Sequence, residues 1–223
     1  MDKLSMIFLG APGAGKGTQA TKICEKYNLP HISIGDLIRA SLNDDSENSR
    51  LLKEQMQSGK LIDDKIIIAL LNERLNLDDC KDGYILDGFP RNLNQAYIYD
   101  EMLKNEGKTL GHVILLEAPK EITQKRILGR MMCPKCGQIY NKLFEHTKPL
   151  NDNLCDKCNL PLVSRDDDNE ETFEKRYQTY LLETEPIINY YQEKGVLVKV
   201  DSSLDQDYTF KQIETIINKV NND

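Results

Sequence analysis

The sequence GAPGAGKGT, residues Gly10–Thr18, lies between the apolar run Met6–Leu9 and a helix-compatible segment, Gln19–Tyr27. Glycines allow successive backbone N–H groups to turn toward one point, where the positive end of the following helix adds to their field. This arrangement is typical of a loop that binds polyphosphate. Lys16 would reach the outer phosphates of a nucleoside triphosphate. Thr18 lies one residue beyond the usual position of the Ser or Thr whose hydroxyl helps to hold Mg²⁺ or a phosphate oxygen.

Length and composition set broad limits on the protein. A chain of 223 residues can bury a full hydrophobic core, which favours one domain with insertions over two equal domains. The net charge of −7 argues against a large basic surface for nucleic acid. No run approaches the roughly 18 apolar residues of a membrane span, and no apolar or Arg-rich segment precedes the first expected strand. A cytoplasmic protein is therefore expected, with cysteines that are reduced or bind metal.

Short apolar runs alternate with amphipathic segments, which is typical of βαβ units and predicts an α/β fold. The expected strands of the buried parallel sheet are Ser5–Leu9, His31–Ile34, Gly83–Asp87, Gly111–Glu117 and Gly195–Asp201. The expected helices are Gly15–Tyr27, Ser46–Ser58, Asp63–Leu77, Asn92–Asn105, Pro119–Arg130, Asn169–Lys194 and Tyr208–Asn221. We expect Pro186 to interrupt the long helix, because proline has no backbone N–H.

Two loops at the carboxyl ends of these strands each carry an arginine. The second strand leads into IGDLIR, which ends at Arg39, and the third leads into DGFPR, which ends at Arg91. Asp87 has the position of a carboxylate that organises Mg²⁺ through water. A single arginine here would most simply be a solvated surface charge. Two arginines at the same edge of a parallel sheet, where nucleotides bind, predict a phosphate site.

Four of the six cysteines form two Cys-x-x-Cys pairs, Cys133 with Cys136 and Cys155 with Cys158. This spacing indicates a zinc ribbon, in which four thiolates close a tetrahedral site. Such a zinc would be structural, because no coordination position stays open, and it would fold a segment too polar to form its own core. The alternative is four reduced thiols without a metal. Cys24 and Cys80 have no partner at such spacing and are expected to be free thiols, outside any site.

Four segments together resemble the adenylate kinase family. They are GAPGAGKGT at 10–18, IGDLIR at 34–39, LDGFPR at 86–91 and RDD at 165–167. DGFPR is the most specific of them, since phosphate loops occur in many unrelated NTPases. The resemblance covers nearly the whole chain, and the insertion between Arg130 and Arg165 has the length found in the long form of the family.

The resemblance implies one nucleoside monophosphate kinase domain, residues 1–223, with a P-loop NTPase-type sheet of five parallel strands flanked by helices. A helical flap at 33–62 would bind AMP, and a small zinc-ribbon-like lid at 130–167 would close over ATP. The reaction would be reversible phosphoryl transfer from Mg-ATP to AMP, giving two ADP. The enzyme would be a monomer whose partners are ATP, AMP and ADP, with no nucleic acid and no membrane.

The resemblance also implies roles for individual residues. The catalytic cations would be Lys16, Arg91, Arg130, Arg165 and Arg176. ATP would contact Gly13, Ala14, Gly15, Lys16, Gly17, Thr18, Arg126, Arg130, Ile139, Tyr140 and Leu204. AMP would contact Ile34, Arg39, Lys60, Leu61, Ile62, Gly88, Phe89, Pro90, Arg91, Gln95, Arg165 and Arg176. Gln95 would recognise the adenine edge and Asp87 would hold Mg²⁺ through water. Asp167 and Asp168 are second-rank candidates near the phosphates.

The chain departs from the family pattern at Ile34, where adenylate kinases commonly have threonine. The resemblance then implies that a hydroxyl contact with AMP is missing. A neutral hydrogen bond contributes about 0.5–1.5 kcal/mol, so AMP binding should be weaker by roughly two- to twelvefold. The choice of base should be kept, because the Gln95 amide can both donate and accept.

Two alternatives stay open. Within the same class, the donor could be GTP or the acceptor a different monophosphate, because motif spacing does not determine the donor. From another class, the chain could be a zinc-ribbon nucleic-acid-binding module attached to an ATPase. From Arg130 to Arg165, both included, there are six Lys or Arg residues and three acidic ones, so this insert is positively charged. A lid that closes over triphosphate needs the same sign of charge.

Overall fold

The structure is a computed structural model that describes residues 4–41 and 62–220. The helix expected at Ser46–Ser58 and the expected AMP contacts Lys60 and Leu61 lie outside the described residues. Most of the helical flap expected at 33–62 is therefore also outside this description, except for its two ends.

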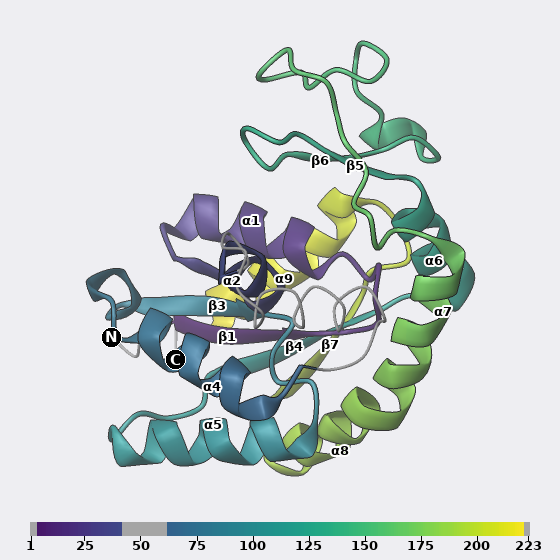
Figure 1. The fold of residues 1–223 in the computed structure, drawn as a ribbon. Helices are drawn as coiled ribbons and strands as arrows, with labels where there is room; N and C mark the ends of the chain where they lie inside the picture. Colours follow the sequence, from purple (N-terminus) through teal and green to yellow (C-terminus); the bar gives the residue numbers. More distant parts are fainter. Residues whose placement is uncertain (1–3, 42–61, 221–223) are drawn as a thin grey trace.

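A five-stranded parallel sheet lies at the centre of the molecule, with strand order β2-β3-β1-β4-β7 (Figure 1). The strands are β1 (Leu4–Leu9), β2 (His31–Ser33), β3 (Gly83–Asp87), β4 (His112–Glu117) and β7 (Leu197–Asp201). In the register of the central strand, Ile7 lies opposite Leu86 of β3 and Val113 of β4. The expected α/β class and the five-stranded parallel sheet are confirmed.

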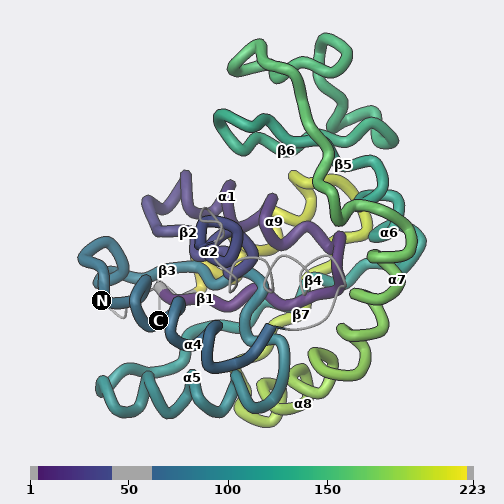
Figure 2. The backbone as a smooth tube through the Cα atoms, in the orientation of Figure 1, coloured from purple at the N-terminus to yellow at the C-terminus, as the bar shows by residue number. Residues whose placement is uncertain are grey.

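Helices cover both faces of the sheet, as the ribbon and tube views show (Figures 1 and 2). One face is covered by α1 (Lys16–Tyr27) and α9 (Gln206–Val220), and the other by α4 (Asp64–Leu75), α5 (Leu93–Asn105) and α8 (Glu185–Glu193). Side chains of β1 alternate between the two cores: Met6 and Phe8 pack with α1 and α9, whereas Ile7 and Leu9 pack with the other three helices. Burial on both faces explains why the strand is apolar throughout.

The remaining elements are shorter segments around the sheet and in the insert. They are α2 (Ile34–Ser41), α6 (Lys120–Leu128), α7 (Glu170–Thr179) and two short 3₁₀ turns, Asp78–Cys80 and Glu145–Thr147. A separate antiparallel pair, β5 (Arg130–Met132) with β6 (Ile139–Asn141), extends away from the core at the top of Figure 1. No helix within the described residues has both the length and the apolar character needed to cross a membrane.

The second strand is shorter than expected. It ends at Ser33, and Ile34 is already the first residue of α2, so no loop separates strand from helix. The Ser33 hydroxyl accepts a hydrogen bond from the backbone N–H of Asp36 at 3.3 Å. This is the contact of a helix N-cap, and it allows the chain to turn directly from strand into helix.

The long helix expected at Asn169–Lys194 is interrupted, but before Pro186 and not at it. A π-helical turn, Tyr180–Thr184, connects α7 to α8, and Pro186 lies in the first turn of α8. Proline cannot donate to the carbonyl one turn earlier, so the preceding backbone widens. The hydroxyl of Thr184 then donates to the carbonyl of Arg91 at 2.8 Å, which joins the widened turn to the loop after β3.

Candidate functional site

The glycine-rich loop runs from the end of β1 to the start of α1. Gly13 and Gly15 have φ angles of 85° and 98°, in the region that side-chain-bearing residues avoid. A Cβ at Gly13 would also lie 2.2 Å from the carbonyl oxygen of Thr123. The first N–H groups of α1 have no acceptor within the helix. The loop therefore presents unpaired donors at the positive end of a helix dipole.

Lys16 lies across this loop. Its ammonium group donates to the carbonyl oxygens of Gly10 at 2.7 Å and Ala11 at 2.9 Å. Burial lowers the pKa of Lys16 to about 8; Asp87 opposes this shift, and the charges of three arginines of the site add to it. The lysine is thus held in a place where its own positive charge is unfavourable.

Asp87 ends β3 opposite the start of α1. Its side chain is 14% exposed, and its Oδ2 lies 3.4 Å from His31 Nε2. A Cβ at position 17 would lie 3.1 Å from the same oxygen, so Gly17 keeps the space between loop and carboxylate open. The carboxylate contributes the negative charge that raises the pKa of Lys16.

Arg91 is oriented by the backbone of its own loop. Its Nε donates to the carbonyl of Gly88 at 2.8 Å, and its backbone N–H donates to Gln95 Oε1 at 2.8 Å. Burial lowers the pKa of Arg91, and the charges of Asp87 and Asp167 act in the opposite direction. The guanidinium therefore lies among the charged groups of the sheet edge and not on the outer surface.

Two further arginines are held by carboxylates that precede α7. Arg130 donates to both oxygens of Asp168, with Nε at 2.7 Å from Oδ2, and the Asp168 side chain is only 1% exposed. Arg176, on α7, donates to Asp167 at 2.9 Å. Burial lowers the pKa of Arg176, and nearby Arg91 and Arg130 contribute to that decrease. Asp167 and Asp168 thus contact the arginines, which fixes guanidinium orientation.

Arg165 differs from these arginines because no carboxylate neutralises it directly among the described residues. Its buried Nε has no hydrogen-bond partner there, and its NH2 group lies 3.8 Å from the sulfur of Met132. Burial, followed by the charges of Arg130 and Arg39, lowers the pKa of Arg165 to about 10. An incompletely paired, partly desolvated guanidinium has a strong affinity for an anion.

Arg39, Ile34 and Ile62 lie at the two ends of the segment expected to form the AMP flap, and their surroundings differ. Arg39 forms an ion pair with Asp36 on the same helix, with Nε at 3.1 Å from Oδ1. Ile34 and Ile62 are buried, 1% and 7% exposed, and they belong to the apolar core under the sheet edge. The arginine is therefore a charged group near Arg91 and Arg165, whereas the two isoleucine side chains are buried.

Gln95 is buried, with an exposed fraction of 2%, and both ends of its amide are engaged. Its Nε2 donates to Asp64 at 2.7 Å, and its Oε1 accepts from the N–H of Arg91. Sequence analysis did not single out Asp64. The only available signal was the pair Asp63-Asp64 at a helix start, which capping by Asp63 explains on its own.

Three further residues expected to contact ATP lie on separate segments: Arg126 on α6, Tyr140 on β6 and Leu204 after β7. Arg126 donates to the carbonyls of Ser202 and Leu204, both at 2.8 Å, and its guanidinium lies 6.0 Å from the ring centre of Phe144. Leu204 is 57% exposed. Tyr140 is 6% exposed, and its hydroxyl accepts from the N–H of Asp156 at 2.9 Å, inside the insert. The structure thus joins Arg126 to Leu204 and directs the Tyr140 hydroxyl away from them.

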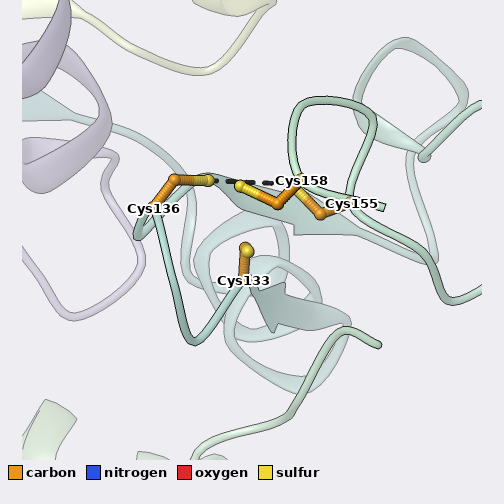
Figure 3. Close-up of side chains that lie close together, drawn as sticks. All are labelled: Cys133, Cys136, Cys155 and Cys158. Carbon is orange, nitrogen blue, oxygen red and sulfur yellow. Dashed lines mark hydrogen bonds between the residues drawn. The ribbon is translucent and has the colours of Figure 1, made fainter. Parts of the chain in front are cut away.

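The four paired cysteines point toward one another (Figure 3). Their sulfur atoms all lie within 4.8 Å of one another. Each pair is closed by a residue with positive φ, Gly137 or Asn159, whose N–H donates to the carbonyl of the first cysteine. Burial raises the pKa of Cys155, but bonds from Tyr140 and backbone N–H groups outweigh it and lower that pKa to about 6. Four thiolates so close together require a cation, so the group fits a tetrahedral metal ion.

Comparisons with known proteins point to one family. Residues 8–196 match the family model described as adenylate kinase. The chain is 46% identical to an adenylate kinase of Archaeoglobus fulgidus over 97% of this chain and 99% of that protein. It is 44% identical to an adenylate kinase of Kosmotoga olearia over 96% of this chain and 100% of that protein. The identity to an adenylate kinase of Oceanobacillus iheyensis is 41%, over 97% and 100% of the two chains.

The lowered pKa of Lys16 predicts a pH-dependent stability. The unfolded chain keeps this proton up to about pH 10.5, whereas the folded chain releases it near pH 8. Between these values the unfolded state binds more protons, so the free energy of unfolding rises with pH. Without nucleotide, we expect the free energy of unfolding of wild type to rise by about 1–3 kcal/mol relative to that of Lys16→Met between pH 8 and pH 10.5.

Urea denaturation of both proteins across this pH range measures the difference. Lys22→Met, on the same helix but paired with Asp207 of α9, controls for the loss of a lysine. If the difference in free energy of unfolding between wild type and Lys16→Met stays constant or falls as the pH rises, the assignment of a desolvated ammonium at this position is contradicted.

Proposed function

The chain belongs to the adenylate kinase family, which interconverts ATP and AMP with two ADP, and we propose that the cations around Lys16 align and stabilise the transferring phosphoryl group. The protein is an ATP:AMP phosphotransferase. The observation that supports this site is that Arg91, Arg130 and Arg176, from separate segments, lie close enough to Lys16 for their charges to lower its pKa.

On the donor side, we assign the phosphates of ATP to the backbone of Gly13–Thr18 and to Lys16. This part of the proposal is supported by the positive φ angles of the loop and by the free N–H groups at the start of α1. Arg126 is proposed to lie near the phosphates, and Leu204, whose carbonyl accepts from Arg126, is proposed as a further ATP contact. Ile139 and Tyr140 would then contribute backbone or apolar surface, because the Tyr140 hydroxyl is bonded within the insert.

On the acceptor side, we assign the phosphate of AMP to Arg39 and Arg91, and its base to Gln95. The segment Gly88–Pro90 supports Arg91, since the Gly88 carbonyl accepts from the arginine Nε. Ile34 and Ile62 would form the apolar floor of this part, because both side chains are buried in the adjacent core. Lys60 and Leu61, outside the described residues, are kept as proposed AMP contacts on the resemblance alone.

The transferring phosphoryl group carries charge on its equatorial oxygens and passes between two nucleotides, so no nucleophilic side chain is needed. AMP supplies the attacking oxygen. One well-placed arginine contributes about 10³–10⁵ in rate in related phosphoryl transfers. Arg165, which lacks a carboxylate partner among the described residues, and Arg176 are proposed to contact this group from the side of the insert.

Adenylate kinases use Mg-ATP, and Asp87 is the group proposed to hold Mg²⁺ through water. The carboxylate faces the start of α1 across the open space that Gly17 leaves. When bound, Mg²⁺ neutralises charge on the phosphate oxygens. Asp87 would orient water ligands of the ion, and its charge also maintains the protonated form of Lys16.

The insertions at 33–62 and 130–167 are proposed to close over the substrates within one domain of 223 residues. Closure excludes water, which would otherwise accept the phosphoryl group. The insert carries its own small core, built from Met131, Tyr140 and the buried cysteines, and this supports movement as a unit. We propose that Cys133, Cys136, Cys155 and Cys158 hold one structural Zn²⁺ there. We also propose a monomer that acts in the cytoplasm.

The first prediction here concerns the reaction. Lys16→Met should lower kcat by about 10²–10³-fold, as loss of one preorganised donor does, without unfolding the protein. Lys22→Met is the matched control and should retain activity, because the Lys22 ammonium group pairs with Asp207 of α9. A coupled assay with ATP and each monophosphate, with and without Mg²⁺, measures both. Equal ATP hydrolysis in the presence and absence of AMP would show that the protein is not a transferase.

The second prediction concerns the metal. Protein purified without chelators should contain one zinc per chain, and Cys133→Ala should lose it. The melting temperature should fall more strongly than the rate of the chemical step, because structural zinc contributes directly to the folding of the segment it closes. Cys24→Ala, a buried thiol outside the cluster, should retain the metal. Elemental analysis and thermal denaturation test this, and metal-free wild-type protein rules out a structural zinc.

The third prediction concerns Ile34. Ile34→Thr should tighten AMP binding by roughly two- to twelvefold through one hydroxyl contact. Because Ile34 is 1% exposed, the same change should cost about 1–3 kcal/mol of stability without nucleotide. Ile34→Val, which removes a methylene without adding a hydroxyl, should show no gain in affinity. Calorimetric titration with AMP measures this. A native preference for UMP, CMP or GMP as acceptor would mean that Ile34 marks a changed specificity.

A further inference from the structure

The first turns of α4 and α5 lie side by side on one face of the sheet (Figure 1). Asp64, the first residue of α4, accepts hydrogen bonds from three side-chain amides of the segment that starts α5. Asn92 Nδ2 and Gln95 Nε2 donate to its Oδ1 at 3.0 and 2.7 Å, and Asn94 Nδ2 donates to its Oδ2 at 2.7 Å. One carboxylate therefore holds the start of the helix that carries Gln95.

These contacts determine which way the Gln95 amide faces. The N–H of Arg91 can only donate, so it requires Oε1 at its side, 2.8 Å away. A carboxylate can only accept, so Asp64 requires Nε2. Rotation of the amide by 180° would place oxygen against oxygen and N–H against N–H. Since Gln95 is 2% exposed, water cannot readily compensate for that arrangement.

Asp64 is suited to this role because it stays ionised. Burial raises its pKa, but hydrogen bonds from Asn94, Asn92 and Gln95 more than compensate, and the net effect lowers it. Its position at the positive end of α4 also favours the carboxylate. At neutral pH the group therefore accepts hydrogen bonds and does not donate them.

We propose that Asp64 is a positioning residue that sets the base specificity of the acceptor site by fixing the orientation of the Gln95 amide. This inference rests on the proposed contact of Gln95 with the base of AMP. After its two protein contacts, the amide keeps one N–H on Nε2 and one lone pair on Oε1. A donor beside an acceptor, in this order, matches the N1 acceptor and the N6 amino donor of adenine.

Hypoxanthine presents the reverse pattern, with a donor at N1 and an acceptor at O6. It has nearly the shape of adenine, so shape alone discriminates poorly between the two bases. With the amide held in one orientation, both hydrogen bonds to hypoxanthine become repulsive contacts. A site built to hydrogen-bond one base rejects the other through unpaired buried groups.

The experiment compares AMP and inosine monophosphate (IMP) as acceptors in steady-state kinetics of the full-length enzyme. Asp64→Asn has nearly the same shape, but its amide can both donate and accept, so it no longer requires Nε2 of Gln95. We expect KM for AMP to rise about tenfold with a smaller change in kcat, and the preference for AMP over IMP to fall about tenfold. Asn94→Ala removes another contact of the same carboxylate without touching Gln95 and should keep the preference.

Gln95→Ala and the double variant complete the test. Gln95→Ala should reduce the preference for AMP strongly, and in that background Asp64→Asn should change it no further. If Gln95→Ala keeps the preference, the proposed contact of Gln95 with the base fails, and the inference fails with it. If only Gln95→Ala alters the preference, or if Asp64→Asn raises KM equally for AMP and IMP, Asp64 is merely structural. Should Asp64→Asn not fold, Asp64→Ser is judged by the same ratio.

Discussion

The repulsion between like charges that are partly removed from water is the constraint on which this structure depends. Lys16 and Arg165 both have lowered pKa values, with burial as the largest cause and neighbouring arginines adding to it. A chain without ligands gains nothing by collecting such groups. The fold makes the arrangement possible by bringing them in on separate elements, each stabilised by its own apolar core, so that the cost is distributed over a large and well-packed domain.

Carboxylates compensate for only part of this repulsion. Asp168 and Asp167 hold Arg130 and Arg176 in fixed orientations, and Asp87 lies opposite Lys16. Arg165 has no such partner within the described part of the chain. Full neutralisation would leave a stable protein with little affinity for phosphate, whereas no neutralisation would prevent the arginines from being oriented. Partial neutralisation retains both the orientation and a net positive potential for polyphosphate.

The sequence was sufficient where a local pattern has one physical solution. Alternating apolar runs predict the parallel sheet, and two Cys-x-x-Cys pairs predict the sulfur cluster that the structure contains. It was insufficient where the outcome depends on contacts between distant segments. Asp64 accepts hydrogen bonds from three side chains at the start of another helix, and Thr184 donates to the carbonyl of Arg91. No local sequence pattern indicates either contact. Partners of individual arginines could not be predicted at all, because ion pairing depends on side-chain geometry.

The two kinds of recognition in the proposed site therefore depend on different parts of the fold. Charge acts over several ångströms and tolerates small displacements, so loops and a separate insert can supply the phosphate contacts. Selection of a base depends on the direction of single hydrogen bonds, and a small rotation of an amide destroys it. Gln95 accordingly lies near the start of a helix, is buried, and is held by Arg91 on one side and Asp64 on the other. In the proposed site, the buried start of α5 would distinguish the bases, while loops and the insert would supply the phosphate contacts.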